Sequence, residues 1–325
     1  MVLIITSKVD PHADKVIEYF HKSGVKFFRF NTEDFPISTR LSWTISNQQS
    51  EHFLLKTLHG REIQRDEIKS AWYRKPLPFV FDKKITNPQV KDLINTESNA
   101  TTNGLYLNLK HILWINDPYK NRVASNKLLQ LSIAKELGFE IPDTLITNNP
   151  KTAKEFYSKH DGNIINKPIN QAYFETDDGY FLIYANKVTE KELESLNLVS
   201  YGPTLFQEYI PKKIELRITI VGDQIFTAAI DSQSSKKTMV DWRHYDFQNV
   251  PHFTFELPQR IKDICFKLVK KLGLVFAAID MVLTPDERYI FLEINPNGQY
   301  LWIELLTGLP ISHAIAEILI KNNRI

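Results

Sequence analysis

The chain has 325 residues, of which 43% are hydrophobic and 24% charged, as in an ordinary globular protein. Its formal net charge is +2, with Lys and Arg spread along the chain, so the composition gives no sign of nucleic-acid binding. No stretch approaches the roughly 20 apolar residues that cross a bilayer, and the single cysteine, Cys265, has no partner for an internal disulfide. These features predict a cytoplasmic protein that is not inserted in a membrane and has more than one lobe.

The first third of the sequence alternates between short apolar runs and a helical pattern. Residues 2–6 predict a buried strand, the following residues a helix that stops at Gly24, and residues 26–30 a second strand. This order is typical of the start of a doubly wound α/β sheet. The turn after the first strand contains no glycine, which argues against dinucleotide binding there. Further strands and a long helix from about residue 89 to 111 complete this lobe.

A proline after Asn116-Asp117 marks the best boundary between lobes, because a residue before proline is biased away from helix. Beyond it, Ser125 is predicted to cap a helix that reaches Gly138, which places Lys127 in a first turn that favours anions. A second lysine, Lys167, ends an apolar strand. A lysine in that position is most often simply solvated.

Two apolar runs near the C-terminus flank a turn-like segment at residues 284–288, and each run contains one acidic residue. In a regular hairpin, Asp280 and Glu293 are direct cross-strand neighbours, and Asn295 shares their face. Two opposed carboxylates in an apolar sheet require positive charge between them. A divalent cation such as Mg²⁺ meets that requirement. Pairing with nearby Lys or Arg, or a bulge that separates the acids, is the alternative.

Residues 206–220 contain a second charged pattern. Strand alternation after Pro211 puts Glu215, Arg217 and Thr219 on one face and apolar residues on the other. Such a face is either solvated or part of a site, and Arg217 is suited to bidentate contact with phosphate.

The order of these motifs resembles the ATP-grasp superfamily. The resemblance implies an ATP-grasp fold with an N-terminal Rossmann-like pre-ATP-grasp lobe, which divides the chain into residues 1–117, a central lid domain at 118–205 and a C-terminal domain at 206–325. It also implies binding of ATP and Mg²⁺. The nucleotide-contacting residues that it assigns are Lys127 and Lys167 at the phosphates, Glu208, Tyr209 and Ile210 at an adenine hinge, and Glu215 at the ribose.

The same resemblance assigns Asp280, Glu293 and Asn295 to Mg²⁺ and Arg217 to the transferred phosphate. One departure concerns the lid. Residues 169–173 have no glycine, whereas many ATP-grasp lids follow the second lysine with a Gly-rich loop.

A closer resemblance, to the microviridin-type peptide macrocyclases (graspetide or omega-ester ligases), covers nearly the whole chain. It rests on residues 71–76, 141–147, 207–211, 221–223, 241–246 and, most specifically, 293–304. It implies side-chain ester or amide crosslinking of a ribosomal precursor peptide that has a leader and a core with Asp or Glu and Ser, Thr or Lys. It also implies a homodimer. Arg243 is then a candidate to orient the substrate carboxylate, although a structural ion pair is an equal alternative.

The acidic residues of the lid are a further candidate feature. Asp177 and Asp178, with Glu190, Glu192 and Glu194, suit a basic leader, but a solvated acidic face is the simpler interpretation. Two other functions stay open: an ATP-grasp ligase that adds amino acids to a peptide or protein C-terminus, and a nucleotide-binding regulator without turnover.

Overall fold

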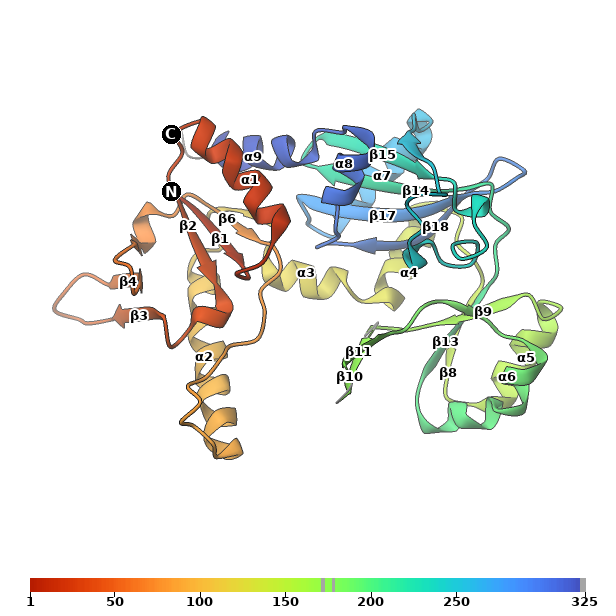
Figure 1. Cartoon of the computed structure of the whole chain (residues 1–325), viewed down its shortest axis with the longest axis horizontal. Coiled ribbons are helices and arrows are strands. Elements are labelled where there is room, and N and C mark those ends of the chain that lie inside the picture. Colours follow the sequence, from red (N-terminus) through yellow and green to blue (C-terminus); the bar gives the residue numbers. More distant parts are fainter. Residues whose placement is uncertain (171–172, 177–178, 322–325) are drawn as a thin grey trace.

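The computed structural model describes residues 1–170, 173–176 and 179–321, and every structural statement below concerns this part of the chain. Its elements form an α/β molecule in which an N-terminal lobe and a lid flank a C-terminal sheet (Figure 1). No helix among the described residues is both long and apolar enough to span a membrane. The expectation for Asp177 and Asp178 lies outside the described residues.

The N-terminal lobe is built on a parallel sheet with strand order β2-β1-β6-β7. Its elements are β1 (Val2–Thr6), α1 (Pro11–Lys22), β2 (Phe27–Asn31), β6 (Ser70–Tyr73), α2 (Pro88–Asn108) and β7 (Leu113–Ile115). A three-stranded antiparallel sheet, β3 (Thr39–Thr44), β4 (His52–Thr57) and β5 (Glu62–Gln64), extends from it. Every residue of β1 is buried, as a strand covered on both faces requires.

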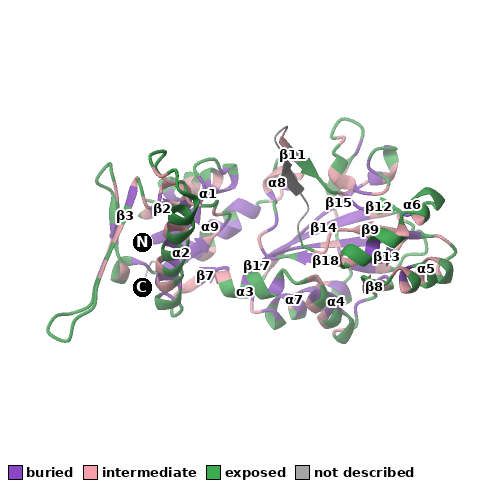
Figure 2. Ribbon diagram, turned by 90° about the horizontal axis from the view of Figure 1, so that it is seen from below, coloured by how far each residue is buried: buried purple, intermediate pink, exposed green. Residues whose placement is uncertain are grey.

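The lid is a small antiparallel sheet of order β12-β9-β13-β8 with helices on its outer side. It contains β8 (Thr144–Thr147), α5 (Pro150–Lys159), β9 (Ile164–Lys167), β12 (Asn186–Lys187), α6 (Glu190–Glu194) and β13 (Thr204–Glu208), and a separate hairpin of β10 (Tyr173–Thr176) and β11 (Gly179–Leu182). Thr189 and Glu192 form a capping box at the start of α6. Figure 2 shows the outer helices of the lid as largely exposed.

The C-terminal sheet is antiparallel, in the order β16-β15-β14-β17-β18. Its elements are β14 (Ile214–Val221), β15 (Gln224–Ile230), β16 (His252–Thr254), α7 (Gln259–Lys271), β17 (Phe276–Leu283), β18 (Tyr289–Asn295), α8 (Leu301–Thr307) and α9 (Ile311–Lys321). Helices α4 (Lys127–Glu136) and α7 cover one face, where Leu216 and Ile218 of β14 enter the core. The alternate residues Glu215, Arg217 and Thr219 therefore occupy the opposite face, and all three are buried.

The helix that begins at Lys127 has a different cap from the predicted one. Asn126 is the N-cap, and its side chain accepts a hydrogen bond from the backbone N–H of Leu129 at 3.0 Å. Ser125 instead ends the preceding helix α3 (Pro118–Ala124), where its hydroxyl donates to the carbonyl of Asn121. The prediction of a Ser125 cap is wrong because a second short helix precedes α4 directly. Lys127 is nevertheless the first helical residue.

The two large lobes share one core. Helix α1 of the N-terminal lobe packs on α9 near the C-terminus, and Trp72, Phe276 and Tyr300 belong to the same buried cluster. Cys265 is fully buried on α7, within the core of the C-terminal lobe, and burial raises the pKa of its thiol to about 12.

Candidate active site

The acidic hairpin has the register that the sequence predicts. Asp280 of β17 lies directly opposite Glu293 of β18, and Asn295 is opposite Ala278 on the same face. The hairpin is not regular, however. Leu283 pairs with Tyr289, which places the centre of the turn half a residue away from the centre that a regular hairpin would have. A register shift after Asp280 compensates for this offset, so the two acids still meet.

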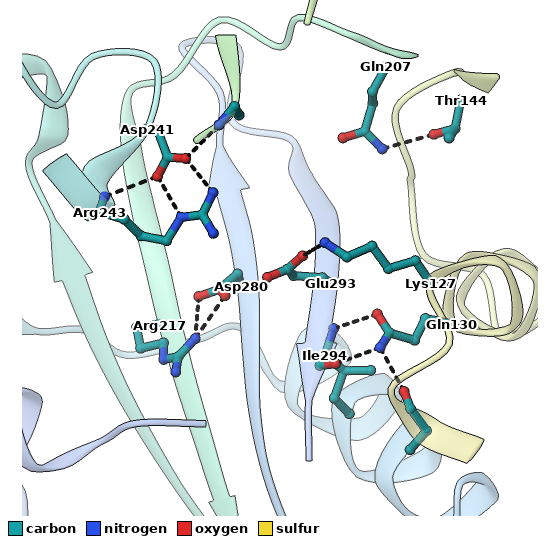
Figure 3. A network of polar contacts seen from close by, with 12 residues as sticks. Lys127, Gln130, Thr144, Gln207, Arg217, Asp241, Arg243, Asp280, Glu293 and Ile294 are labelled. Carbon is teal, nitrogen blue, oxygen red and sulfur yellow. Dashed lines mark hydrogen bonds and ion pairs between the residues drawn. The ribbon is translucent and has the colours of Figure 1, made fainter. Parts of the chain in front are cut away.

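Each acid has its own basic partner (Figure 3). Arg217, the neighbour of Asp280 on β14, donates from Nη1 to both carboxylate oxygens at 2.9 and 2.8 Å. Lys127 at the start of α4 donates from Nζ to Oε2 of Glu293 at 2.9 Å. The structure therefore brings the opposed acids together with two of the basic residues that the sequence singled out.

The two carboxylates differ in their proton affinity. Burial raises the pKa of Asp280, the Glu293 charge raises it further, and Arg217 only partly opposes this rise. Burial also disfavours the charged form of Glu293, but Lys127 and Lys167 outweigh burial and hold its pKa at about 2. Glu293 is thus the fixed negative charge of the pair.

Lys167 enters the site from the lid, at the end of β9. Burial and the Lys127 charge lower the pKa of its ammonium to about 8, while Glu293 opposes this change. In the described part of the chain, its Nζ makes no hydrogen bond or ion pair. Two lysines from different elements, α4 and β9, therefore face one carboxylate, and one of them has spare donors for an anion.

A cleft of about 660 Å³, including its open part, lies between the lid and the C-terminal sheet. Its wall is formed in part by Ile165 of the lid and by Ile210, Val282 and Leu292, which also pack against one another. Residues 208–210 connect the lid to β14 along this wall, and Lys187 lies 3.8 Å from the centre of the Tyr209 ring. The cleft thus has an apolar slot at one end and the charged cluster at the other.

The other hinge residues have protein partners. Glu208 accepts a hydrogen bond from the backbone N–H of Asp143 at 3.2 Å. Glu215 is buried and ion-paired with Lys212 at 2.9 Å, and burial raises the pKa of its carboxyl in spite of that pair. Both residues line the cleft. By contrast, the buried backbone N–H of Ile210 makes no hydrogen bond within the described residues.

A loop above the acids contains the Asp241–Arg243 pair. Asp241 accepts hydrogen bonds from the backbone N–H of Arg243 at 3.0 Å and from its Nε at 2.8 Å. The Asp241 carboxylate also accepts from the N–H of Ala185, which connects the loop to the lid. Arg243 also lies near the two acids of the hairpin, since its charge lowers the pKa of both Asp280 and Glu293. Arg243 is therefore ion-paired with Asp241 and also lines the cleft.

Three supporting residues were not predicted as part of the site. Arg74 and Asn116 of the N-terminal lobe hold the loop after β18: Nη1 of Arg74 donates to the Asn297 carbonyl at 2.9 Å, and Nδ2 of Asn116 donates to the Pro296 carbonyl at 2.8 Å. Gln130 of α4 bonds both backbone groups of Ile294. Arg74 lies in a motif that supported the family resemblance, but its partner Asn297 is more than 200 residues away in sequence.

Oxygen ligands for a hard cation are present at the acidic hairpin. Asp280 and Glu293 supply carboxylates, and Asn295 supplies an exposed amide whose oxygen accepts from the Asn297 N–H at 2.9 Å. Among the described residues, no group of three or more acidic, His or Cys side chains is arranged to hold a metal by itself. This donor set fits Mg²⁺, which keeps waters and takes phosphate oxygens along with one or two carboxylates.

Comparison with known proteins places these features in a family. Residues 1–122 match the MvdD pre-ATP grasp domain, and residues 124–319 match the RimK-like ATP-grasp domain. The macrocyclase MdnC from Microcystis aeruginosa MRC, solved with precursor peptide MdnA, is 34% identical, with 98% of this chain and 99% of that chain covered and a TM-score of 0.87.

A RiPP-associated ATP-grasp ligase from Chryseobacterium gregarium, solved with ADP and a leader and core peptide, is 32% identical, with coverage of 98% and 96% and a TM-score of 0.89. The Glutamate–LysW ligase ArgX of Sulfurisphaera tokodaii is 21% identical over 281 residues, which are 85% of this chain and 95% of the relative. This chain belongs to the RimK-like ATP-grasp ligases with an MvdD-type pre-ATP-grasp domain, enzymes that use ATP with Mg²⁺.

Proposed function

We propose that this enzyme forms ester or amide crosslinks between side chains of a ribosomally made precursor peptide, and so closes macrocycles. The supporting observation is that two basic residues, Lys167 and Arg243, line one cleft together with the paired acids Asp280 and Glu293. Full-length similarity to a macrocyclase and to a RiPP-associated ligase, both solved with peptides, supports the choice of substrate.

The nucleotide occupies the cleft between lid and sheet in this proposal. The apolar wall around Ile210 receives the adenine, and the unpaired N–H of Ile210 donates to a ring nitrogen, flanked by Glu208 and Tyr209. Glu215 faces the ribose. Lys127 and Lys167 bind the phosphates. Lys127 has one carboxylate partner, Glu293, and Lys167 has no partner in the described chain, so both can donate to phosphate oxygens.

Asp280, Glu293 and Asn295 hold Mg²⁺, which when bound neutralises charge on the phosphates. Arg217 keeps Asp280 in place and faces the transferred phosphoryl group. Lys127, which is paired with Glu293, exchanges this contact for phosphate as nucleotide binds.

The chemistry follows from the weakness of a carboxylate as an electrophile. One oxygen of a substrate Asp or Glu attacks the γ-phosphorus of ATP, ADP leaves, and an acyl phosphate forms. A Ser or Thr hydroxyl, or a Lys amine, then attacks the carbonyl carbon and releases phosphate and a proton. The part of this chain is to orient and to stabilise charge. Arg243, held by Asp241, orients the substrate carboxylate toward the phosphates.

The assembly and organisation of the chain are part of the same proposal. We place the domain limits at residues 1–117, 118–205 and 206–325, with the first limit between β7 and α3 and the second within β13, near the end of the lid sheet. The enzyme works as a homodimer in the cytoplasm, on a peptide whose core contains acidic residues and Thr, Ser or Lys.

The test is to incubate the enzyme with ATP, Mg²⁺ and a candidate precursor and to record the peptide mass. Loss of one water per ring is the expected result. Added amino-acid masses would instead indicate a ligase that extends a C-terminus, and an unchanged mass with no phosphate release would indicate a regulator. The control is Glu293→Gln, which is expected to remain folded by circular dichroism but to lose turnover. Undiminished turnover in this variant would contradict the metal assignment.

A further inference from the structure

Five aromatic side chains gather beside the cleft, and we name them the aromatic shelf: Trp242, Tyr245, Phe247, His252 and Trp302. The Trp242 and Trp302 rings are stacked, with centroids 4.9 Å apart at an angle of 30°. The Tyr245 and Phe247 rings are stacked at 5.1 Å, and His252 meets Trp302 edge-on at 5.5 Å. Residues from a loop, an edge strand and α8 thus form one continuous surface.

The shelf begins where the reaction takes place. Trp242 stands between Asp241 and Arg243 and lines the cleft together with Asp280. Burial raises the pKa of the Tyr245 hydroxyl, and the charges of Arg217 and Arg243 oppose this rise, so the hydroxyl lies near both guanidinium groups. A peptide whose carboxylate reaches Arg243 therefore lies next to Trp242, the inner end of the shelf.

The outer part of the shelf is open to solvent. Tyr245 is 44% exposed and Phe247 is 49% exposed, although both are large and mainly apolar. Tyr245 also has a φ of 42°, a left-handed conformation that costs energy for a residue with a bulky side chain. Leu305 and Leu306 follow Trp302 by one helical turn and are 74% and 43% exposed, so they extend the apolar surface. A contiguous exposed apolar surface of this kind is typical of a binding site.

We propose that the aromatic shelf binds an aromatic or large aliphatic side chain of the substrate peptide, two residues away from the acid that is activated. In an extended peptide, residues i and i+2 point to the same side and lie about 7 Å apart. The shelf adjoins the cleft through Trp242, so two such side chains can enter the two places together. The shelf thereby selects which of several acidic residues is activated. This inference rests on the proposed function, because it takes the substrate to be a peptide.

The test measures peptide binding directly and needs no turnover. The full chain is labelled with 5-fluorotryptophan at its five tryptophans, and fluorine NMR follows titration with two blocked pentapeptides. One is acetyl-Phe-Ala-Glu-Ala-Phe-amide and the other has Ala in place of each Phe. We expect the Phe peptide to shift the Trp242 and Trp302 signals and to bind about tenfold more tightly, which corresponds to about 1.4 kcal/mol.

Two variants localise the effect. Phe247→Ala is expected to reduce the tenfold preference to about twofold, since it removes the exposed end of the shelf. Phe253→Ala is the matched control: Phe253 is 44% exposed and next to His252, but it points to the other face of β16 and should leave the preference unchanged. Thermal unfolding confirms that both variants are folded.

Four results would overturn the inference: equal affinity for the two peptides, no binding of either at about 10 mM, a preference that survives Phe247→Ala, or one that Phe253→Ala also abolishes. The outcome is separate from that of the proposed function. Ring formation without a Phe preference would refute only the proposed role of the shelf. A Phe preference without ring formation would support the shelf as a peptide-binding site and refute the macrocyclase proposal.

Discussion

Gly298 lies where the loop after β18 passes closest to the reaction centre. A Cβ at this position would lie 2.5 Å from Cβ of Ala278 and 2.8 Å from Nη2 of Arg217. Ordinary contact between carbon atoms is about 3.5–4.0 Å, so Gly298→Ala creates an overlap of about 1 Å with a β-carbon in the middle of a sheet. Arg217 would move as well, and its bond to the Gln299 carbonyl and its pair with Asp280 would be strained.

Overpacking of this kind costs about 1–3 kcal/mol. For a chain of this size, such a loss lowers Tm by roughly 1.5–4.5 °C. Turnover should fall by more than the decrease in the folded fraction accounts for, because the displaced Arg217 guanidinium is part of the candidate active site.

Thermal unfolding and ATP-dependent phosphate release measure the two effects. Gly104→Ala is the matched control, since Gly104 lies in α2 with no atom within 4 Å of an added Cβ, and this change should stabilise the protein by about 0.5–1 kcal/mol. The double variant Ala278→Gly with Gly298→Ala should be more stable than the sum of the single changes. Unchanged stability and unchanged turnover in Gly298→Ala would refute the close packing described here.

Three other predictions follow from buried groups. Arg74→Met should raise the Mg²⁺ concentration needed for half-maximal phosphate release several-fold, because the loop that follows Asn295 loses an anchor; an unchanged requirement would count against this role. Cys265 should not react with a thiol reagent until the chain unfolds, because burial raises its pKa to about 12; prompt labelling of the native protein would contradict this. Burial, with a contribution from the Arg74 charge, lowers the pKa of His12 from 6.5 to about 3. The unfolded chain therefore takes up the proton first, and stability should decrease as pH falls from 6.5 toward 3, by up to about 1.4 kcal/mol per pH unit. His12→Gln should flatten this dependence in urea unfolding, and an identical pH profile would refute it.

The sequence predicted the acidic hairpin well because a strand pair is a local structure. The pairing of Asp280 with Glu293 depends only on residues within one hairpin, and its apolar alternation is unambiguous. The bulge in β18 could not be predicted. It cancels the offset of the turn, so the acids pair as they would in a regular hairpin without either irregularity. Alternation on β14 likewise predicted that Arg217 shares a face with Glu215, and the structure adds that this face is buried.

Long-range partners had no local signal. Asn116 was recognised only as part of a boundary, yet its side chain bonds backbone groups of Phe276 and Pro296. The aromatic shelf joins residues from three elements, and nothing in the sequence places Phe247 next to Trp302. The cap of α4 was wrong for a local reason, because Ser125 and Asn126 are both good cap residues and the adjoining helix α3 decides between them.

The central claim is that the enzyme activates a substrate carboxylate by phosphorylation, and isotope transfer tests it most directly. The precursor is prepared with ¹⁸O in the carboxylates of its acidic side chains and incubated with the enzyme, ATP and Mg²⁺. Mass spectrometry of the released phosphate should show one labelled oxygen for each ring formed, because the oxygen that attacks ATP leaves with the phosphate. Rings accompanied by unlabelled phosphate, with both labelled oxygens kept in the peptide or with one of them lost to water, would contradict the account.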